Sequence, residues 1–438
     1  MRIAIIGSGV AGLGAALALS EDNDVRLFEK DARFGGHSNT VDVAFGDGTV
    51  PVDTGFIVYN ERNYPNLCGF FDHLDVETEW SDMSFGFSLG DGAMEWAGDG
   101  LGTVFAQRSN LLRPRFVRGV LDILRFNRLA AEHLDDGSLA GVSLGDWLER
   151  ERFSPWLRDC YDLPMGGALW STPIGRMLDF PAESYCAFFR NHDLLGALAE
   201  RQRWRTVTGG SRTYVERVLA RLGPRAVANT AALSVTRKGG RPRVRFSDGS
   251  EAAFDQVILA CHGPQALALL SDADAEEQAT LGAFRTSPNR AILHSDPGLM
   301  PRRHKVWSSW NFLSGGPVAD QANSAPVTYW MNRLQNIDRA RPLFLSLNSS
   351  RDPDPATIHA EFDYAHPVMD GEAFAAQARM GSIQGRGGVW HAGAWLGYGF
   401  HEDGLRAGLN VASALGARPA WARDVADLPF GAMAEAAE

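Results

Sequence analysis

Residues 1–40 have the sequence MRIAIIGSGVAGLGAALALSEDNDVRLFEKDARFGGHSNT, and this stretch decides the fold. Arg2 to Ile6 is an apolar run that suits a buried parallel strand and is too short for a membrane span. A glycine turn follows, and Leu13 to Ser20 then shows a helical pattern rich in Ala and Leu. A second apolar run, Val25 to Phe28, ends in Glu29. The order strand, glycine turn, helix, strand, acid predicts a βαβ unit that binds a dinucleotide.

The glycines of this turn have separate tasks. Gly7 allows the tight turn, Gly9 lets the backbone approach a pyrophosphate, and Gly12 lets the helix pack closely against the strand. The pyrophosphate would lie on free N–H groups at the helix start, where the helix dipole favours negative charge. Glu29 is placed to accept hydrogen bonds from both ribose hydroxyls. The predicted cofactor residues of this unit are Gly7, Gly9, Val10, Ala11, Gly12, Glu29 and Lys30.

A second glycine turn, RFGGHSNT at 33–40, comes directly after the acid, and DTGF at 53–56 follows soon afterwards. With the first turn, these motifs resemble the amine oxidase and carotenoid desaturase superfamily of flavoproteins. The resemblance implies FAD as the cofactor, with the second motif along its phosphates and ribityl chain. His37 stands where an Arg is usual. The residues that the resemblance assigns to FAD here are Gly35, Gly36, His37, Ser38, Thr54, Gly55 and Phe56.

The last cofactor motif is VWHAGAWLGYGFHEDGLRAG at 389–408, where a strand enters a glycine turn and a helix starts near Asp403. In the resembling flavoproteins the N-terminus of this helix points at the flavin, and its dipole stabilises the charge of the reduced ring. Phe400 falls at their aromatic wall, whereas Ala394 replaces their ribityl-binding acid. The implied cofactor residues here are Gly393, Ala394, Phe400, His401 and Gly404.

The resemblance implies an α/β fold, with a Rossmann-type (GR2-like) FAD-binding domain intertwined with an α+β substrate domain. Backbone near Leu233 would meet the adenine. The expected division assigns 1–70, 206–288 and 376–415 to the FAD domain, 71–205 and 289–375 to the substrate domain, and 416–438 to a C-terminal tail. The pattern further predicts a hairpin over 41–52, strands within 77–96, 289–293 and 325–347, and helices over 105–134 and 142–205.

Composition limits the class of partner. The net charge of −11 argues against nucleic acid as the main partner. The four cysteines are far apart and lack metal-ligand spacing, which favours reduced thiols in a cytoplasmic protein and predicts no metal site. No stretch is long and apolar enough to span a membrane, and the N-terminal run is a core strand rather than a signal peptide.

Four further motifs resemble a narrower flavoprotein group: DTGFIVYN at 53–60, YPNL at 64–67, NHDLL at 191–195 and GFHEDG at 399–404. Its members are associated with cyclopropane-fatty-acid-synthase-like methyltransferases, and plant cyclopropane fatty acid synthases carry a similar N-terminal module. The resemblance implies a lipid or fatty acyl substrate and a fatty acid methyltransferase as partners. Within NHDLL, His192 beside Asp193 is expected to be a structural pair rather than a catalyst.

The chemistry follows from the residues available. The predicted strand from Asn289 to His294 has no Lys where many amine oxidases keep one, and acids suited to an ammonium substrate are sparse in the aromatic-rich half. The leading hypothesis is therefore an FAD-dependent desaturase of unsaturated, methyl-branched fatty acyl chains of phospholipids, a step toward dienes and furan fatty acids. The alternatives are a fatty acid double-bond isomerase, an amine oxidase, or a non-catalytic FAD-bound partner of the methyltransferase.

Desaturation needs a base within hydrogen-bond reach of the acyl chain. The candidates are Tyr59, His401 and Glu402. Two have structural alternatives: His401 lends only its backbone N–H to the flavin, and Glu402 replaces the missing ribityl-binding acid.

The segment from Phe105 to Leu134 is basic and amphipathic, with six Arg against one Asp up to Arg128. Such a segment in an acidic protein is typical of a peripheral membrane-surface patch. The alternative is an ordinary surface helix that packs its apolar face on the core.

Overall fold

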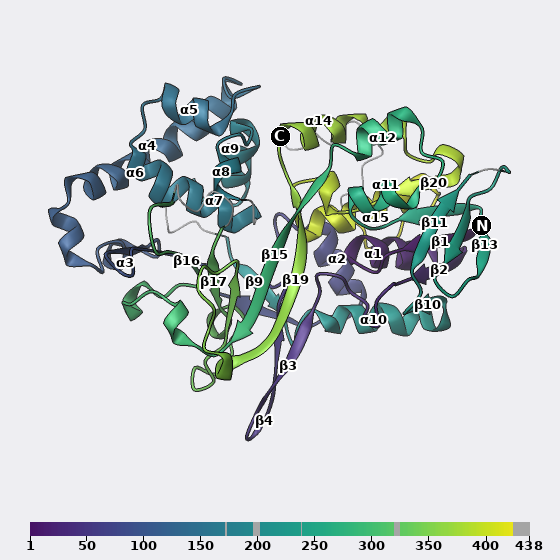
Figure 1. Ribbon diagram of the computed structural model, residues 1–438, viewed down its shortest axis with the longest axis horizontal. Helices are drawn as coiled ribbons and strands as arrows, with labels where there is room; N and C mark the ends of the chain where they lie inside the picture. The colour runs from purple at the N-terminus through teal and green to yellow at the C-terminus, as the bar shows by residue number, and fades with distance from the viewer. Residues whose placement is uncertain (171–172, 196–201, 238, 319–324, 424–438) are drawn as a thin grey trace.

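The computed structural model describes residues 1–170, 173–195, 202–237, 239–318 and 325–423. The fold is mixed α/β, as predicted, with a nucleotide-binding half on the right of Figure 1 and a sheet-and-helix half on the left. Each half has its own hydrophobic core, and Phe400 packs against both cores. No helix within these residues is both long and apolar enough to cross a bilayer.

The nucleotide-binding half is built on a parallel five-stranded sheet with β1 at its centre and β2 and β14 on either side. The sheet comprises, in spatial order, β10 (Ala226–Val227), β2 (Asp24–Phe28), β1 (Arg2–Ile6), β14 (Gln256–Leu259) and β20 (Val389–His391). These strands come from widely separated parts of the chain. The two halves are therefore intertwined along the chain, as the sequence predicted.

Helix α1 (Val10–Leu19) lies inside this half, and all of its residues are buried. An Ala/Leu-rich helix without charges can be buried on every side, because it leaves no polar side chain without water. The surrounding helices are α2 (Pro65–His73), α10 (Arg212–Leu222), α11 (Gly263–Leu269), α12 (Ala275–Leu281), α14 (Gly371–Arg379) and α15 (His401–Ala414). An antiparallel sheet of β11 (Ala232–Thr236), β12 (Arg243–Phe246) and β13 (Glu251–Ala253) packs on β2 through Phe28 and Phe246.

The other half contains a seven-stranded mixed sheet. Its order is β19 (Ile358–Val368), β15 (Arg285–His294), β18 (Phe344–Leu347), β17 (Val327–Trp330), β16 (Trp310–Ser314), β7 (Phe85–Leu89) and β8 (Met94–Ala97). The long antiparallel pair β15 and β19 runs between the two halves (Figure 1). The strands predicted within 325–347 are β17 and β18, and α13 (Met331–Leu334) lies between them. Asn332 of α13 binds the backbone of the loop that follows, including the N–H of Leu343.

Helices cover the upper left of Figure 1. They are α3 (Leu101–Val104), a 3₁₀ turn (Arg108–Leu112), α4 (Pro114–Asp135), α5 (Leu144–Arg150), α6 (Pro155–Leu157), a π-helical turn (Arg158–Asp162), α7 (Leu163–Trp170), α8 (Ile174–Met177) and α9 (Ala182–Asn191). The helix predicted over 105–134 is divided into the 3₁₀ turn and α4, which begins at Pro114. Residues 171–172 and 196–201 of the predicted 142–205 helical region lie outside the described residues.

The end of that helical prediction is wrong. Trp204 and Arg205 belong to strand β9 (Trp204–Val207), which pairs with β5 (Tyr59–Asn60) and with β6 (Thr78–Ser81). Pairing on both sides gives the backbone N–H and C=O groups of β9 their hydrogen-bond partners. The local sequence did not indicate this pairing. The predicted hairpin is confirmed as β3 (Thr40–Phe45) and β4 (Gly48–Asp53). Of the expected tail, Trp421 packs on Phe70 with ring centroids 5.2 Å apart, and 424–438 lie outside the described residues.

Candidate functional site

The first glycine turn has the shape that a pyrophosphate site needs. Gly7 has φ +105°, and a Cβ there would lie 2.5 Å from the carbonyl oxygen of Ala260. A Cβ on Gly12 would lie 2.0 Å from the Gly7 oxygen. By contrast, a Cβ on Gly9 would meet nothing within 4 Å. Gly7 and Gly12 therefore serve close packing, while Gly9 borders open space in front of α1, where a phosphate group fits.

Glu29 lies beside this turn at the end of β2. Its Oε2 accepts hydrogen bonds from the backbone N–H (3.0 Å) and the hydroxyl (2.6 Å) of Ser8, and its Oε1 accepts from the Asp31 N–H (3.1 Å). The carboxylate is thus held in one orientation beside the glycine turn, and its contact with ribose stays a prediction. Ser8 was not singled out in the sequence, because the GxGxxG pattern leaves that position open. The Lys30 side chain is exposed and 3.9 Å from Asp31, so only the Lys30 backbone lies next to Glu29.

The second glycine turn packs over the first. Gly36 has φ +58°, and a Cβ there would lie 3.1 Å from the Cα of Gly9. The Gly35 N–H donates to the Ser8 carbonyl at 3.1 Å. On its other side the turn meets the DTGF segment, where the Phe56 N–H donates to the His37 carbonyl at 2.8 Å. A Cβ on Gly55 would lie 2.1 Å from that same carbonyl oxygen. The two turns and DTGF therefore form one continuous cradle.

His37 lies in a cluster of rings beside this cradle. Its ring is 5.0 Å from that of Tyr364 and 5.2 Å from that of His366, both on β19, and 6.2 Å from that of His262. Burial, followed by the neighbouring His charges, holds the pKa of His37 well below its usual value, so the ring is neutral. Its Nε2 is buried and has no hydrogen-bond partner in the part of the chain that the structure describes, and the same holds for Nδ1 of His366. Unpaired buried nitrogens beside a phosphate cradle fit a polar cofactor group.

Thr54 and Ser38 are joined to distant parts of the chain. The Thr54 hydroxyl is 2.8 Å from the hydroxyl of Tyr364. The Ser38 hydroxyl is hydrogen-bonded to the phenol of Tyr214 and lies 3.1 Å from His401 Nε2. Tyr364, Tyr214 and His366 were missed in the sequence, since they carry no motif and reach the site only through the fold.

The starts of α1 and α15 lie side by side. A Cβ on Gly404 would lie 2.8 Å from Val10, and a Cβ on Gly408 would lie 2.2 Å from the Ala11 carbonyl oxygen. Gly404 therefore serves helix packing in this arrangement. Because α15 begins at His401, two residues before the expected start, its positive end falls beside that of α1. Both dipoles favour negative charge in the same region, which suits the phosphates and the reduced flavin.

The turn before α15 is held by Asp403. Its Oδ2 accepts hydrogen bonds from the N–H groups of Tyr398 (3.0 Å) and Phe400 (2.9 Å). Gly393 leaves no room for a side chain, because a Cβ there would lie 2.3 Å from the Trp395 ring nitrogen. Ala394 starts a short 3₁₀ turn, and its carbonyl accepts from the Gly399 N–H at 3.1 Å. Asp403 therefore organises this turn, and its carboxylate is bound to backbone.

Aromatic side chains gather at the start of α15. Phe400 stacks on Phe188 of α9 with centroids 5.0 Å apart, and Trp170 lies 4.8 Å from Phe188. The expected pair of His192 and Asp193 does not form: His192 binds the Phe188 carbonyl at 2.9 Å, and Asp193 pairs with Arg62 at 3.0 Å. Burial lowers the pKa of His192 to about 4, so it adds a neutral ring to this aromatic cluster.

His401 lies within the site but is a weak base. Its ring stacks on Phe56 at 3.8 Å, and its Nε2 is 2.9 Å from the Tyr214 hydroxyl. Burial lowers the pKa of His401 to about 3, so the ring is neutral near pH 7 and holds a proton poorly. The geometry favours a role in joining Ser38 to Tyr214 beside the cofactor.

Glu402 faces helix α2 rather than the cradle. Its carboxylate accepts hydrogen bonds from the Asn66 N–H (3.0 Å), the Asn66 side-chain amide (2.8 Å) and the Leu67 N–H (2.9 Å). These are orphan donors of the α2 N-terminus. Glu402 therefore caps α2, and its replacement of the ribityl-binding acid stays a prediction. Burial raises the pKa of Glu402 to about 7, a value that suits a general base, but its oxygens are occupied by α2.

Tyr59 is buried in β5 against Tyr64 and Phe71. Burial raises the pKa of its phenol, so the group is neutral. Leu233 lies at a bulge, where the pairing of β11 with β12 shifts between Ala232 and Ser234. The bulge takes the Leu233 backbone out of the regular ladder, and its contact with adenine stays a prediction.

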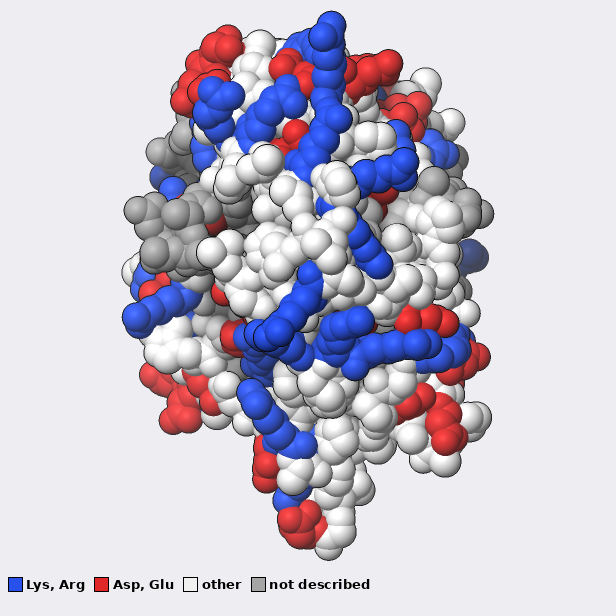
Figure 2. Space-filling view, turned by 90° about the vertical axis from the view of Figure 1, so that its left-hand side faces the viewer, with Lys and Arg blue, Asp and Glu red and all other residues white. Residues whose placement is uncertain are grey.

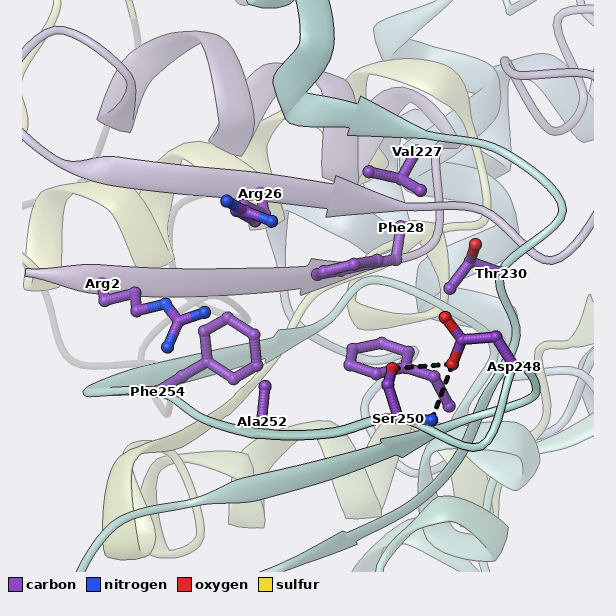
Figure 3. Close-up of a pocket in the computed structure, with 10 residues that line it drawn as sticks. Arg2, Arg26, Phe28, Val227, Thr230, Asp248, Ser250, Ala252 and Phe254 are labelled. Atoms are coloured by element: carbon purple, nitrogen blue, oxygen red, sulfur yellow. Dashed lines mark hydrogen bonds between the residues drawn. The ribbon is translucent and has the colours of Figure 1, made fainter.

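A surface pocket of about 200 Å³ lies beside the parallel sheet (Figure 3). The rings of Phe28, Phe246 and Phe254 form its apolar part, and Asp248 accepts from the N–H and hydroxyl of Ser250 at its rim. None of the predicted cofactor residues lines it, so it is distinct from the cradle.

Asp162 is a buried carboxyl that the sequence did not indicate. It ends the π-helical turn, is fully buried, and neither of its carboxylate oxygens has a hydrogen-bond partner among the described residues. Burial, with the Asp122 charge adding to it, raises the pKa of Asp162 well above its usual value. The carboxyl is therefore protonated in the folded protein.

Asp162→Asn should stabilise the protein progressively as pH rises. Below about pH 3.8 both states of the wild type hold the proton and the variant gains nothing. Above it the unfolded chain ionises while the folded carboxyl stays protonated, so wild-type stability falls by about 1.4 kcal/mol per pH unit. Urea unfolding at several pH values measures this slope, and exposed Asp136→Asn is the control. Equal slopes for wild type and Asp162→Asn would contradict the assignment.

Comparison with known proteins agrees with this geometry. Residues 5–74 match the NAD(P)-binding Rossmann-like domain family. Carotenoid phi-ring synthase of Streptomyces griseus is 32% identical over 170 residues, which are 34% of this chain and 31% of that protein. The chain thus matches less than a third of the length of this relative.

Solved structures resemble nearly the whole chain. A CLA-producing fatty acid isomerase from P. acnes has a TM-score of 0.69 at 15% identity, covering 95% of this chain and 98% of its own. Variants of putrescine oxidase reach 0.67 at 16% identity (95% and 99% covered), and cyclohexylamine oxidase from Brevibacterium oxydans reaches 0.67 at 14% (94% and 98%). The chain therefore has the fold that these solved structures share, and the cradle lies in the part that matches the NAD(P)-binding Rossmann-like domain family.

Proposed function

We propose that this chain, with the FAD site and the fold of the amine oxidase and carotenoid desaturase superfamily, is an FAD-dependent oxidoreductase. Its proposed reaction is desaturation of unsaturated, methyl-branched fatty acyl chains of phospholipids. The proposed partner that supplies the branched chain is a fatty acid methyltransferase. The proposed substrate class rests on the aromatic side chains that surround the start of α15.

At that start, the aromatic side chains of Phe400, Phe188 and Trp170 lie together, as described above. The two acids of the same turn, Glu402 and Asp403, are both bound to backbone N–H groups. Neither is therefore free to neutralise a substrate ammonium. An uncharged chain avoids the desolvation cost that a cation would meet in such surroundings. These contacts support an acyl chain over an amine.

The chemistry requires a weak C–H bond. An unactivated CH₂ group is a poor hydride donor, whereas an allylic C–H beside a methyl-substituted double bond is weaker. The allylic carbon loses a hydrogen with its electron pair as hydride, and the neighbouring carbon loses a hydrogen as a proton. A second C=C bond then forms between these two carbons. FAD, when bound, supplies the two-electron acceptor for the hydride. The aromatic cluster would hold the chain and exclude water, which keeps the reacting carbons in place.

Glu402→Gln tests whether Glu402, whose pKa of about 7 suits a general base, is the base of the reaction. Since Glu402 binds three donors of α2, we expect this change to cost roughly 1–3 kcal/mol of stability while substrate-dependent flavin bleaching stays within about threefold. Thermal unfolding and stopped-flow absorbance measure the two effects. A fall of about 100-fold in bleaching rate at full FAD content would instead identify Glu402 as the base. Glu183→Gln, at the start of α9, is the control.

Anaerobic mixing with a methyl-branched, unsaturated phospholipid tests the reaction itself. Desaturation requires flavin bleaching and a new conjugated diene in equal amounts, measured by absorbance and by mass spectrometry of the released acyl chains. Bleaching by amines but not by lipid would identify an amine oxidase. If neither causes bleaching or a change in the lipid, the FAD-bound partner role replaces the proposal.

A fatty acid double-bond isomerase is the second candidate. The solved structure from P. acnes that resembles 95% of this chain is described as such an isomerase, which supports this alternative at the level of fold. An isomerase returns the hydride at another carbon and needs no external electron acceptor. Double-bond migration without net flavin reduction in the same assay would identify this reaction.

A further inference from the structure

Large apolar side chains are exposed together on one surface of the helical layer. Six of the nine that the described residues expose lie between 101 and 124, and Leu112 is 86% exposed. We call this area, with the arginines around it, the α3–α4 surface. It comprises Leu101, Leu111, Leu112, Val117, Leu121 and Leu124 with Arg108, Arg113, Arg115, Arg118 and Arg128. Exposed apolar side chains gathered in one short stretch of the chain are typical of an interaction site.

Helix α4 has apolar side chains on two opposite faces. Phe116 and Phe126 are buried in the core. Val117, Leu121 and Leu124 recur at spacings of four and three residues, so they share one face, and all three are exposed. The core of the domain explains the first face only. The second face is covered by none of the residues that the structure describes.

The charges of this surface oppose those of the whole chain. Asp122 is the single acid between 101 and 131, and it is buried with its Oδ2 bound to the Ser154 N–H at 3.1 Å. Arg108, Arg115 and Arg118 are exposed and, within the part of the chain that the structure describes, pair with no acid. In Figure 2, which looks onto this end of the molecule, Lys and Arg side chains border an uncharged area.

We infer that the α3–α4 surface docks onto an anionic phospholipid bilayer. Exposed leucines would enter the boundary between headgroups and acyl chains, and the arginines would bind phosphates around them. This inference rests on the proposed function only for its choice of lipid as the partner.

The position of α4 fits that role. Helix α4 packs on α9, and α9 carries Phe188, the ring that stacks on Phe400 at the start of α15. A bilayer on the α3–α4 surface would therefore lie behind the helix that lines the apolar side of the candidate site. An acyl chain that stays in a phospholipid must be met at the membrane, because transfer of the chain through water is costly.

Flotation of the FAD-loaded protein with phosphatidylglycerol-containing vesicles tests the docking. Neutralising Arg108, Arg115 and Arg118 together to Gln should weaken binding by about 100-fold, since each Arg near an anionic surface contributes about fivefold. Arg113 is spared, because it binds the Ala93 carbonyl and Asn110 within the fold. Changing Leu112 and Leu121 to Gln should weaken binding tenfold or more without changing its dependence on salt.

The matched control neutralises three exposed arginines of the nucleotide-binding half, Arg241, Arg245 and Arg379. It carries the same charge change and should bind vesicles as the wild type does. FAD content reports folding in every variant, and no turnover is needed, so failure of the proposed reaction would leave this result readable. Equal binding by all variants, or no binding by the wild type, would overturn the inference. So would a dimer that the leucine changes dissociate in the absence of lipid.

Discussion

Glu29→Ala should raise the dissociation constant for FAD by a factor of roughly 100 to 10⁴. The wild type is expected to be yellow with one FAD held non-covalently, because no Cys or Tyr occupies a recognisable linking position. Removing the carboxylate should delete the two charge-assisted hydrogen bonds that Glu29 is predicted to make to ribose, each of about 1.5–3 kcal/mol. It also frees Ser8, whose N–H and hydroxyl both bind Glu29, so the phosphate turn loses its support. Flavin fluorescence titration of the apoprotein gives the dissociation constant.

Two comparisons make this result specific. Glu216→Ala removes an exposed acid from α10 and should leave the affinity for FAD unchanged. Glu29→Gln keeps the shape but not the charge, and should lie between the wild type and Glu29→Ala. Full FAD retention by Glu29→Ala, or a colourless wild type that binds NAD tightly, would contradict the site described here.

Gly408→Ala should destabilise the protein by about 3 kcal/mol or more and remove FAD at the same time. The new Cβ would lie 2.2 Å from the carbonyl oxygen of Ala11. Both α1 and this side of α15 are buried, so neither backbone can move without disturbing the core. Separation of the helices would also part the two N-termini that face the cofactor. Urea unfolding and the FAD absorbance of the purified variant measure both effects.

Gly371→Ala is the matched control for that change. Gly371 is at the start of α14, and a Cβ there would meet nothing within 4 Å. Alanine should therefore stabilise slightly, by up to about 1 kcal/mol, because it restricts the unfolded chain. Similar stability and FAD content in both variants would show that α1 and α15 tolerate more distance than the structure indicates.

The candidates for the base of the reaction show how a choice made from a sequence motif differs from the contacts that the fold provides. His401 and Glu402 were chosen from the sequence, since they begin the helix that faces the flavin. The fold directs the Glu402 carboxylate to Asn66 and Leu67, more than 330 residues away, and burial makes His401 a weak base. The first contact depends on how α2 packs against α15, and the second on the apolar surroundings of the ring. Neither is encoded in the GFHEDG motif.

The sequence by itself determined the nucleotide-binding unit, its two glycine turns and the acid after β2. The positive φ of Gly7 and the close approach of Gly12 to the Gly7 carbonyl are constraints of backbone geometry within a few residues, and such constraints can be predicted from the order of residue types. Only the tertiary structure decided that Tyr364 and His366 reach the cradle and that Asp162 is buried without a partner. The physical reason is that hydrogen bonding, desolvation and the pKa of a side chain depend on atoms brought near by packing, whatever their distance along the chain.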